Sequence, residues 1–258
     1  MFIDSHLHLI QKDYDKSIAS IIEDAHKNEV NTLIVSCCEL ADLDESLNLL
    51  KYNNVFLTIG LHPSEADSYT EDDILKIESI VKSNHKIIGI GEIGLDYHYG
   101  KDNRFKQIEL FRRQLDLALK LSLPVVIHTR DAVADTLNIL KDYDLKGIIH
   151  CFNGSIEVAK EYINIGYLLG IGGVVTFKNS KLYQVIEELS LNDIVLETDS
   201  PYLSPDRGKK NEPSNIPIIA KRIAEIKNID IEKVADVTSS NVKELFDLKK
   251  TIWYILIS

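Results

Sequence analysis

Short apolar segments alternate with longer amphipathic segments along nearly the whole chain, and this alternation constrains the fold more than any other feature. The apolar segments are rich in Ile, Val and Leu without a regular polar alternation, which is typical of strands covered on both faces of a parallel sheet. We expect eight such strands, at Phe2–His8, Thr32–Ser36, Val55–Leu61, Ile87–Glu92, Pro124–Thr129, Gly147–Cys151, Tyr167–Ile171 and Asp193–Thr198.

The segments between these strands carry apolar residues at three- and four-residue spacing, which predicts helices. The longest follows the fourth strand and reads FKQIELFRRQLDLALKLSL. Ser155 stands where one of these helices should begin, and Gly166 stands where it should end. Eight strand–helix units in a chain of about 250 residues predict an α/β fold of the (β/α)₈ TIM-barrel type. A doubly wound open sheet is the alternative.

The chain has 258 residues, of which 45% are hydrophobic, and these are enough to bury a full core. No linker composition interrupts it, so we expect a single TIM-barrel hydrolase domain over residues 1–248. Residues 249–258 hold the only Trp and a short apolar run. We interpret them as a C-terminal extension, for which a docked segment, a partner contact and a cloning remnant are all compatible roles.

Charge and cysteine content limit the classes of function. The formal net charge of −11 excludes a general attraction to polyanions, so a polyanionic substrate needs a local cationic patch or bound metal ions. Cys37, Cys38 and Cys151 form no C-x-x-C pair, which favours core packing and a reducing cytosol. No basic segment precedes the first apolar stretch, and no apolar run approaches the roughly 20 residues that span a bilayer. We expect a cytoplasmic protein without a membrane contact.

Histidines and acidic residues gather at the carboxyl ends of the expected strands. These ends meet at one face of a barrel, where barrel active sites lie. Imidazoles and carboxylates that converge there are typical metal ligands, and the set is too large for one tetrahedral ion with an open position. Two ions that share a carboxylate use it better. The residues are His6 and His8 on the first strand, His62 after the third, Glu92 on the fourth, His128 on the fifth, His150 on the sixth and Asp199 after the eighth.

A single histidine in a strand is more often a hydrogen-bonded core residue, but coincidence at five strand ends argues against that interpretation for the set. His62 directly precedes Pro63, and we expect it to support a ligand or to face the substrate. Asp4 lies deeper on the first strand, and we expect it to hydrogen-bond to a ligand rather than to bind metal itself. His26, His85 and His98 fall in helix, turn and loop, as ordinary surface residues do.

Eight motifs then occur in a fixed order: DSHLHL, GLHP, GEIGLDY, PVVIHTRDA, HCFNGS, GIGGVVTFKN, LETDSPYL and RGKKNEPSNI. In this combination, from about Phe2 to Phe246, the sequence resembles the TatD-like metal-dependent deoxyribonuclease family. The resemblance implies a (β/α)₈ fold, a divalent-metal site and hydrolysis of phosphodiester bonds in DNA. It also implies six ligands, with Glu92 bridging two ions, the first held by His6, His8 and Asp199 and the second by His128 and His150.

The resemblance further implies two divalent cations, Zn²⁺, Mg²⁺ or Mn²⁺, and a metal-activated water as the nucleophile. Glu92 and Asp199 are the predicted catalytic residues, and Asp199 has a second predicted role as acceptor of the water's proton. In the wider metallohydrolase group the bridge is often a carboxylated lysine. Glu92 therefore points away from the amidohydrolase branch of that group.

Local cations offer a solution to the charge problem. We expect Arg130, Lys178 and Arg207 to contact phosphates, with Lys209 and Lys210 as weaker candidates. His62 is a further substrate-binding candidate, and Tyr202 or Phe177 is placed to stack on a base. A weakly anchored groove favours a single strand or a frayed end of DNA, exonucleolytic cleavage and low sequence specificity.

Two other classes of function remain open. One is another metallohydrolase on the same scaffold, such as a deaminase, a lactonase or an aminoacyl-tRNA esterase. The other is a metal-bearing barrel that only binds its partner. The Glu92 bridge and the Arg207 loop favour the nuclease, and the complete ligand set argues against a protein that only binds.

Overall fold

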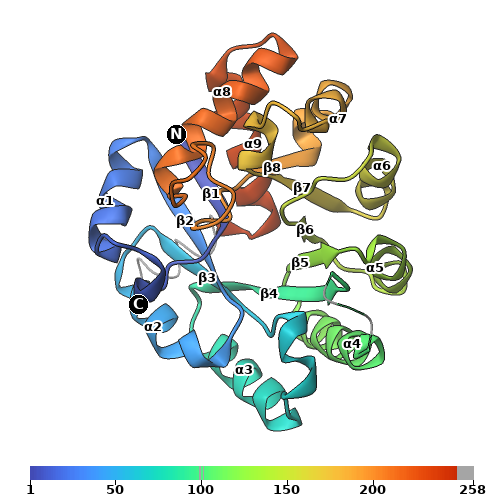
Figure 1. Cartoon of the computed structure of the whole chain (residues 1–258). Helices are drawn as coiled ribbons and strands as arrows, with labels where there is room; N and C mark the ends of the chain where they lie inside the picture. Colours follow the sequence, from blue (N-terminus) through green and yellow to red (C-terminus); the bar gives the residue numbers. More distant parts are fainter. Residues whose placement is uncertain (99, 101, 249–258) are drawn as a thin grey trace.

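The structure is a computed structural model, and it describes residues 1–98, 100 and 102–248. In this part of the chain eight strands form one parallel sheet in sequence order, and β8 lies beside β1 (Figure 1). The predicted (β/α)₈ barrel is confirmed, and the alternative of a doubly wound open sheet is wrong because the strand order never reverses. The strands are β1 Phe2–Leu7, β2 Val30–Cys37, β3 Val55–Ile59, β4 Ile87–Asp96, β5 Val125–Arg130, β6 Gly147–Ile149, β7 Tyr167–Ile171 and β8 Ile194–Leu196.

Helices form a ring outside the strands (Figure 1). In α1 the residues Ile18, Ile21, Ile22 and Ala25 are buried at helical spacing, and the Ser17 hydroxyl caps the first turn. Ser155 likewise caps α6, as predicted. The helices are α1 Ile18–Lys27, α2 Leu43–Asn48, α3 Glu71–Ser83, α4 Arg104–Leu121, α5 Val133–Leu140, α6 Ile156–Asn164, α7 Leu182–Glu188, α8 Ile216–Lys227 and α9 Ile231–Leu245.

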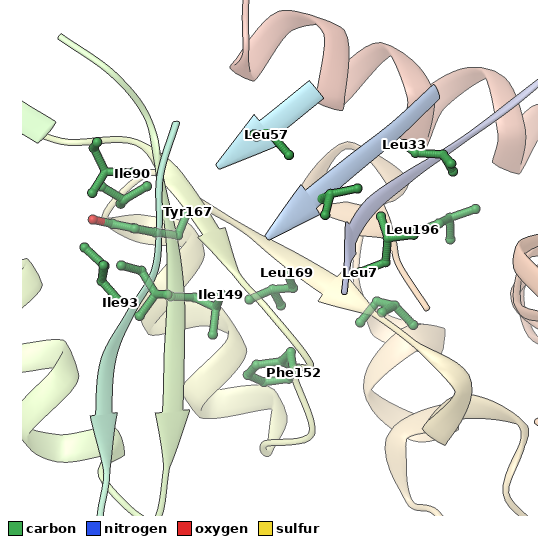
Figure 2. Close-up of a cluster of buried hydrophobic side chains, with 14 of the residues drawn as sticks. Leu7, Leu33, Leu57, Ile90, Ile93, Ile149, Phe152, Tyr167, Leu169 and Leu196 are labelled. Carbon is green, nitrogen blue, oxygen red and sulfur yellow. The ribbon is translucent and has the colours of Figure 1, made fainter. Parts of the chain in front are cut away.

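The larger part of the core lies between the strands and the helices. Leu33, Leu57, Ile149, Leu169 and Leu196 belong to it, and Figure 2 shows these side chains gathered from separate strands. Each is at most 1% exposed, and burial of such a side chain contributes about 1.5–3 kcal/mol to stability. This layer fixes the positions of the strands on which the polar residues lie.

The interior of the barrel changes character along its axis. Near the amino ends of the strands it is apolar, and Val242 from α9 and Phe246 just after α9 close that end. Two residues further along each strand the side chain returns to the same side of the sheet. The apolar residues that face the interior are Ile34, Phe56, Val126, Ile148 and Val195. The residues two positions further on, which face the same side, are all polar: Ser36, Thr58, His128, His150 and Glu197. The barrel therefore holds a polar layer above an apolar plug.

The barrel closes where the segment after β8 runs beside β1. The backbone N–H of His8 donates to the Ser200 carbonyl at 2.8 Å, and that of Asp199 donates to the His6 carbonyl at 3.0 Å. Asp4 accepts hydrogen bonds from the backbone and the hydroxyl of Thr198, at 3.0 and 2.6 Å. Its contact with His6 is to the backbone N–H, at 3.4 Å, so Asp4 supports this ligand candidate through the main chain and not through the imidazole.

Several strand ends differ from the predicted ones. β4 extends to Asp96 rather than Glu92, whereas β6 and β8 end at Ile149 and Leu196, before His150 and Asp199. The predicted extension at residues 249–258 lies outside the described residues, and the single domain over residues 1–248 stays a prediction. Among the described residues, no helix has the length and apolar character needed to cross a membrane.

Candidate metal centre

The structure brings the six predicted ligands together around Glu92. Its Oε2 atom lies 3.4 Å from His6 Nε2 and 3.7 Å from His8 Nε2. Its Oε1 atom lies 2.6 Å from His128 Nδ1 and 2.8 Å from His150 Nε2. Each oxygen of the carboxylate therefore faces its own pair of imidazoles, which is the arrangement expected of a carboxylate shared by two cations.

Asp199 adds a second carboxylate to one of the two halves. Its Oδ1 atom lies 3.5 Å from His6 Nε2 and 3.4 Å from His8 Nε2. The Asp199 backbone has a φ of 54°, in the left-handed region that most residues avoid. Such backbone strain is frequent at functional sites. The first half thus contains His6, His8, Asp199 and Glu92, and the second contains His128, His150 and Glu92.

The donor set fits divalent cations. His6, Glu92, His150 and Asp199 are 1% to 8% exposed, and burial of such polar groups is costly unless something satisfies them. Within the described residues, neither ring nitrogen of His6 has a hydrogen-bond partner, and the same holds for Nδ1 of His150. Buried imidazole nitrogens without hydrogen-bond partners, beside ionised carboxylates, form a donor set that a divalent cation satisfies.

Electrostatics in the pocket favour positive charge between the two carboxylates. Burial raises the pKa of Glu92, but the imidazoles of His150, His128 and His6 outweigh it and hold this pKa well below its usual range. Burial also lowers the pKa of His6, but contacts with Asp199 and Glu92 raise it to about 10. A metal ion would supply the same positive charge and displace the protons.

A cavity of about 880 Å³ opens over the centre, and it separates the predicted substrate-binding residues into two groups. His62, Arg130 and Tyr202 line it together with Glu92 and Asp199. Lys178 and Arg207 do not line it. Arg207 instead lies over the ring of Phe177, with its guanidinium carbon 5.0 Å from the ring centroid.

His62 lies beside the second half of the centre, with its ring centroid 4.6 Å from that of His128. Burial lowers the pKa of His62 to about 4, so the ring is neutral at physiological pH. Nδ1 accepts the backbone N–H of Ser64 at 3.2 Å, which places the ring proton on Nε2. His62 is therefore a hydrogen-bond donor at the edge of the cavity.

Two acidic residues of the site were missed by the sequence reasoning. Asp96 Oδ2 lies 3.2 Å from His128 Nε2. The apolar run predicts a strand that ends at Glu92, so Asp96 falls outside the predicted strand. Alternation along β4 places Glu92 and Asp96 on one face and was the available signal. Glu197 is fully buried and accepts the Cys151 backbone N–H at 2.6 Å, with Oε1 3.9 Å from His150 Nδ1. Burial raises the pKa of Glu197 to about 8.

The cysteine prediction needs a correction. All three cysteines are free, as expected, and Cys37 is buried. Cys38 and Cys151 are partly exposed and line the cavity, so they are not simple core residues. Cys38 directly follows β2 and Cys151 lies two residues after the end of β6, at the end of the barrel that opens into the cavity.

Comparison with known proteins gives concordant matches over nearly the full length. A family model described as TatD related DNase matches residues 3–247. The metal-dependent hydrolase YabD of Bacillus subtilis is 38% identical, over 95% of this chain and 99% of its own length. Human deoxyribonuclease TATDN3 is 31% identical, over 95% and 94%. The crystal structure of the Escherichia coli TatD homolog YjjV superposes with a TM-score of 0.87 at 28% identity, over 95% and 98%.

Proposed function

This chain belongs to the TatD-related DNase family, and from that premise we propose that it is a metal-dependent hydrolase that cleaves phosphodiester bonds of DNA. The observation that carries the proposal is the position of Glu92, whose two oxygens face two separate pairs of imidazoles. The names of two relatives, a metal-dependent hydrolase and a deoxyribonuclease, support it.

Two divalent cations complete the proposed centre, and Zn²⁺, Mg²⁺ and Mn²⁺ all suit its nitrogen and oxygen donors. His6, His8 and Asp199 would hold the first, and His128 and His150 the second, with Glu92 between them. When bound, two such cations lower the pKa of a water molecule and neutralise the nonbridging oxygens of a phosphodiester.

Asp199 is the proposed proton acceptor. Burial raises its pKa, but contacts with His6 and His8 outweigh burial and keep its pKa below the usual range, so the carboxylate is ionised at neutral pH. Its contacts with these imidazoles use Oδ1. The second oxygen, Oδ2, takes the proton of the attacking water.

Residues at the cavity mouth bind the substrate. His62 donates its Nε2–H, and Arg130 its guanidinium, to nonbridging phosphate oxygens. Tyr202, which is 57% exposed and whose ring centroid lies 6.0 Å from that of His8, stacks on the neighbouring base. Stacking tolerates any base, so sequence specificity is low.

The cavity favours an end of a single strand over an intact duplex. Its volume of about 880 Å³ suits one nucleotide, since pockets of about 300–1,000 Å³ enclose small molecules. Lys178 and Arg207, outside the lining, then contact phosphates further along the strand. This placement supports the proposal of exonucleolytic trimming of a single strand or a frayed end.

End-labelled oligonucleotides test the proposal. Purified protein is incubated with single-stranded DNA, duplex DNA, RNA, an aminoacyl-tRNA and a lactone, with Mg²⁺, Mn²⁺ or Zn²⁺ and then with EDTA. We expect stepwise shortening of single-stranded DNA that EDTA abolishes and that Glu92→Gln lowers by at least about 100-fold, because several kcal/mol of charge stabilisation is lost. Glu39→Gln, which removes another carboxylate from the cavity lining, is the matched control. Cleavage that survives both EDTA and Glu92→Gln, or hydrolysis of the lactone or aminoacyl ester alone, would contradict the proposal.

A further inference from the structure

Both ring nitrogens of His128 are engaged, and they face different groups. Nδ1 points into the centre, 2.6 Å from Glu92 Oε1 and 3.2 Å from His150 Nε2. Nε2 lies 3.2 Å from Oδ2 of Asp96. A neutral imidazole carries one proton, so if Nδ1 offers its lone pair to a cation, Nε2 carries the proton and donates it to Asp96.

Asp96 is itself held from two sides. Its second oxygen, Oδ1, accepts the backbone N–H of His98 at 2.9 Å. Its backbone N–H donates to Oε1 of Gln107 at 2.9 Å, and its carbonyl accepts from Nε2 of Gln107 at 2.8 Å. Gln107 lies on α4 and is 5% exposed. One buried amide thus fixes both backbone groups of Asp96 and sets where its carboxylate can lie.

A different role for Asp96 is direct ligation of a further cation. Ligand atoms of His62, Asp96 and His128 lie within 4.8 Å of one another. The protonation of the two rings argues against this role, because the ring proton of His62 is on Nε2, and a His128 that binds a cation through Nδ1 carries its own proton on Nε2. Two of the three residues therefore offer a proton, rather than a lone pair, to a cation that would lie among them.

We propose that Asp96 is a positioning residue that orients His128 toward the second cation, and that Gln107 holds Asp96 in place for this task. The inference rests on the proposed two-cation centre. A carboxylate behind a ligating imidazole fixes its tautomer and ring orientation and increases its basicity, and loss of such a partner typically weakens metal binding by about 10- to 100-fold.

Metal titration of the metal-free protein, by calorimetry with Mn²⁺ and with Zn²⁺, tests the inference without relying on activity. We expect two ions per chain in the unaltered protein. In Asp96→Ala the first ion binds as before and the second binds about 10- to 100-fold more weakly. Asp96→Asn keeps an oxygen that accepts the Nε2 proton of His128, and it recovers part of this loss.

Asp131→Asn is the matched control, since Asp131 also lines the cavity and, within the described residues, forms its ion pair with the exposed His98 rather than with His128. It should bind both ions within about threefold of the unaltered protein. Unchanged affinities in Asp96→Ala, equal losses in Asp96→Asn and Asp96→Ala, or a third ion that Asp96→Ala loses would each overturn the inference. An unaltered protein that binds no cation would overturn the proposed centre, and this inference with it.

Discussion

At the scale of single residues, the proposed metal centre depends most on Glu92. Its carboxylate is buried among four imidazoles and remains ionised because they surround it. A neutral side chain of the same shape at this position would keep the packing and lose the charge. Glu92→Gln should therefore separate the electrostatic role of this residue from its structural role.

The imidazoles make metal binding depend on pH. In the metal-free protein burial lowers the pKa values of His6 and His8, but contacts with Asp199 and Glu92 outweigh burial and raise them to about 10 and about 9. These rings must lose their protons before they bind a cation, so protons compete with the metal below these pKa values. We expect the apparent Kd for Mn²⁺ to fall by about tenfold or more for each pH unit between pH 6 and pH 8, measured by calorimetry.

His62 provides the control for this pH dependence. Burial already lowers its pKa to about 4, so it is neutral throughout the range and releases no proton. His62→Gln should leave the slope of Kd against pH unchanged. An affinity for Mn²⁺ that does not vary between pH 6 and pH 8 would contradict the assignment of His6 and His8 as ligands.

Gly170 makes room for the buried carboxylate below the centre. A Cβ atom at this position would overlap Glu197 Oε2 and would lie 3.2 Å from the Cα of His150. We expect Gly170→Ala to lower the free energy of unfolding by about 1–3 kcal/mol, because overpacking forces these groups apart. Urea unfolding of the metal-free protein measures it.

Gly172, just beyond the end of β7, gives a matched comparison. A Cβ atom there would be at least 3.6 Å from its neighbours, which is ordinary van der Waals contact. Gly172→Ala should change stability by no more than about 0.5 kcal/mol. Equal effects of the two substitutions would show that Glu197 does not occupy the position described.

At the scale of elements, the segment that ends α9 closes the barrel. Phe246 is 4% exposed and reaches so far into the barrel that a Cβ atom at Gly89 would lie 3.1 Å from its ring. Phe246→Ala should destabilise the protein by about 3–5 kcal/mol through the cavity it leaves. Leu75→Ala on α3, where the side chain is 53% exposed, should cost about 0.5 kcal/mol or less. Thermal or urea unfolding checks both, and a small loss for Phe246→Ala would contradict the plug.

Element boundaries explain which site residues could be predicted from the sequence. His6, Glu92 and His128 lie on strands and His8 directly follows one, and an apolar run that ends in an unusual polar residue points to each of them. Asp96 was not predicted because the strand continues past its apolar run, where alternation from Glu92 is the one remaining signal that a residue faces inward. Glu197 could not be predicted from the sequence, because the contacts that keep its carboxyl group buried come from residues near the ends of β6 and β7.

At the scale of the whole molecule, the barrel could be predicted because strand and helix periods repeat eight times, and each repeat supports the same topology. The order of strands around the barrel follows from short connections between sequence neighbours. Loops lack such periodicity, which is why Lys178 and Arg207 were expected at the phosphate site and lie outside the cavity lining. The sequence could indicate which loops carry cations, but not how those loops turn.

Charge at this scale also bears on function. The molecule carries a net charge of −11, so its surface as a whole repels DNA. Cations bound at the centre would place positive charge at the base of the cavity, where a phosphate must arrive. The proposed nuclease activity is thus inseparable from the proposed metal centre.

The positions of bound cations test that centre most directly. Crystals of the protein grown with Mn²⁺, with data collected at a wavelength where manganese scatters anomalously, locate each ion without assumptions about activity. We predict two anomalous peaks, one beside His6, His8 and Asp199 and the other beside His128 and His150, with one oxygen of Glu92 next to each. A single peak, or peaks that Glu92 does not join, would contradict the proposed two-cation centre.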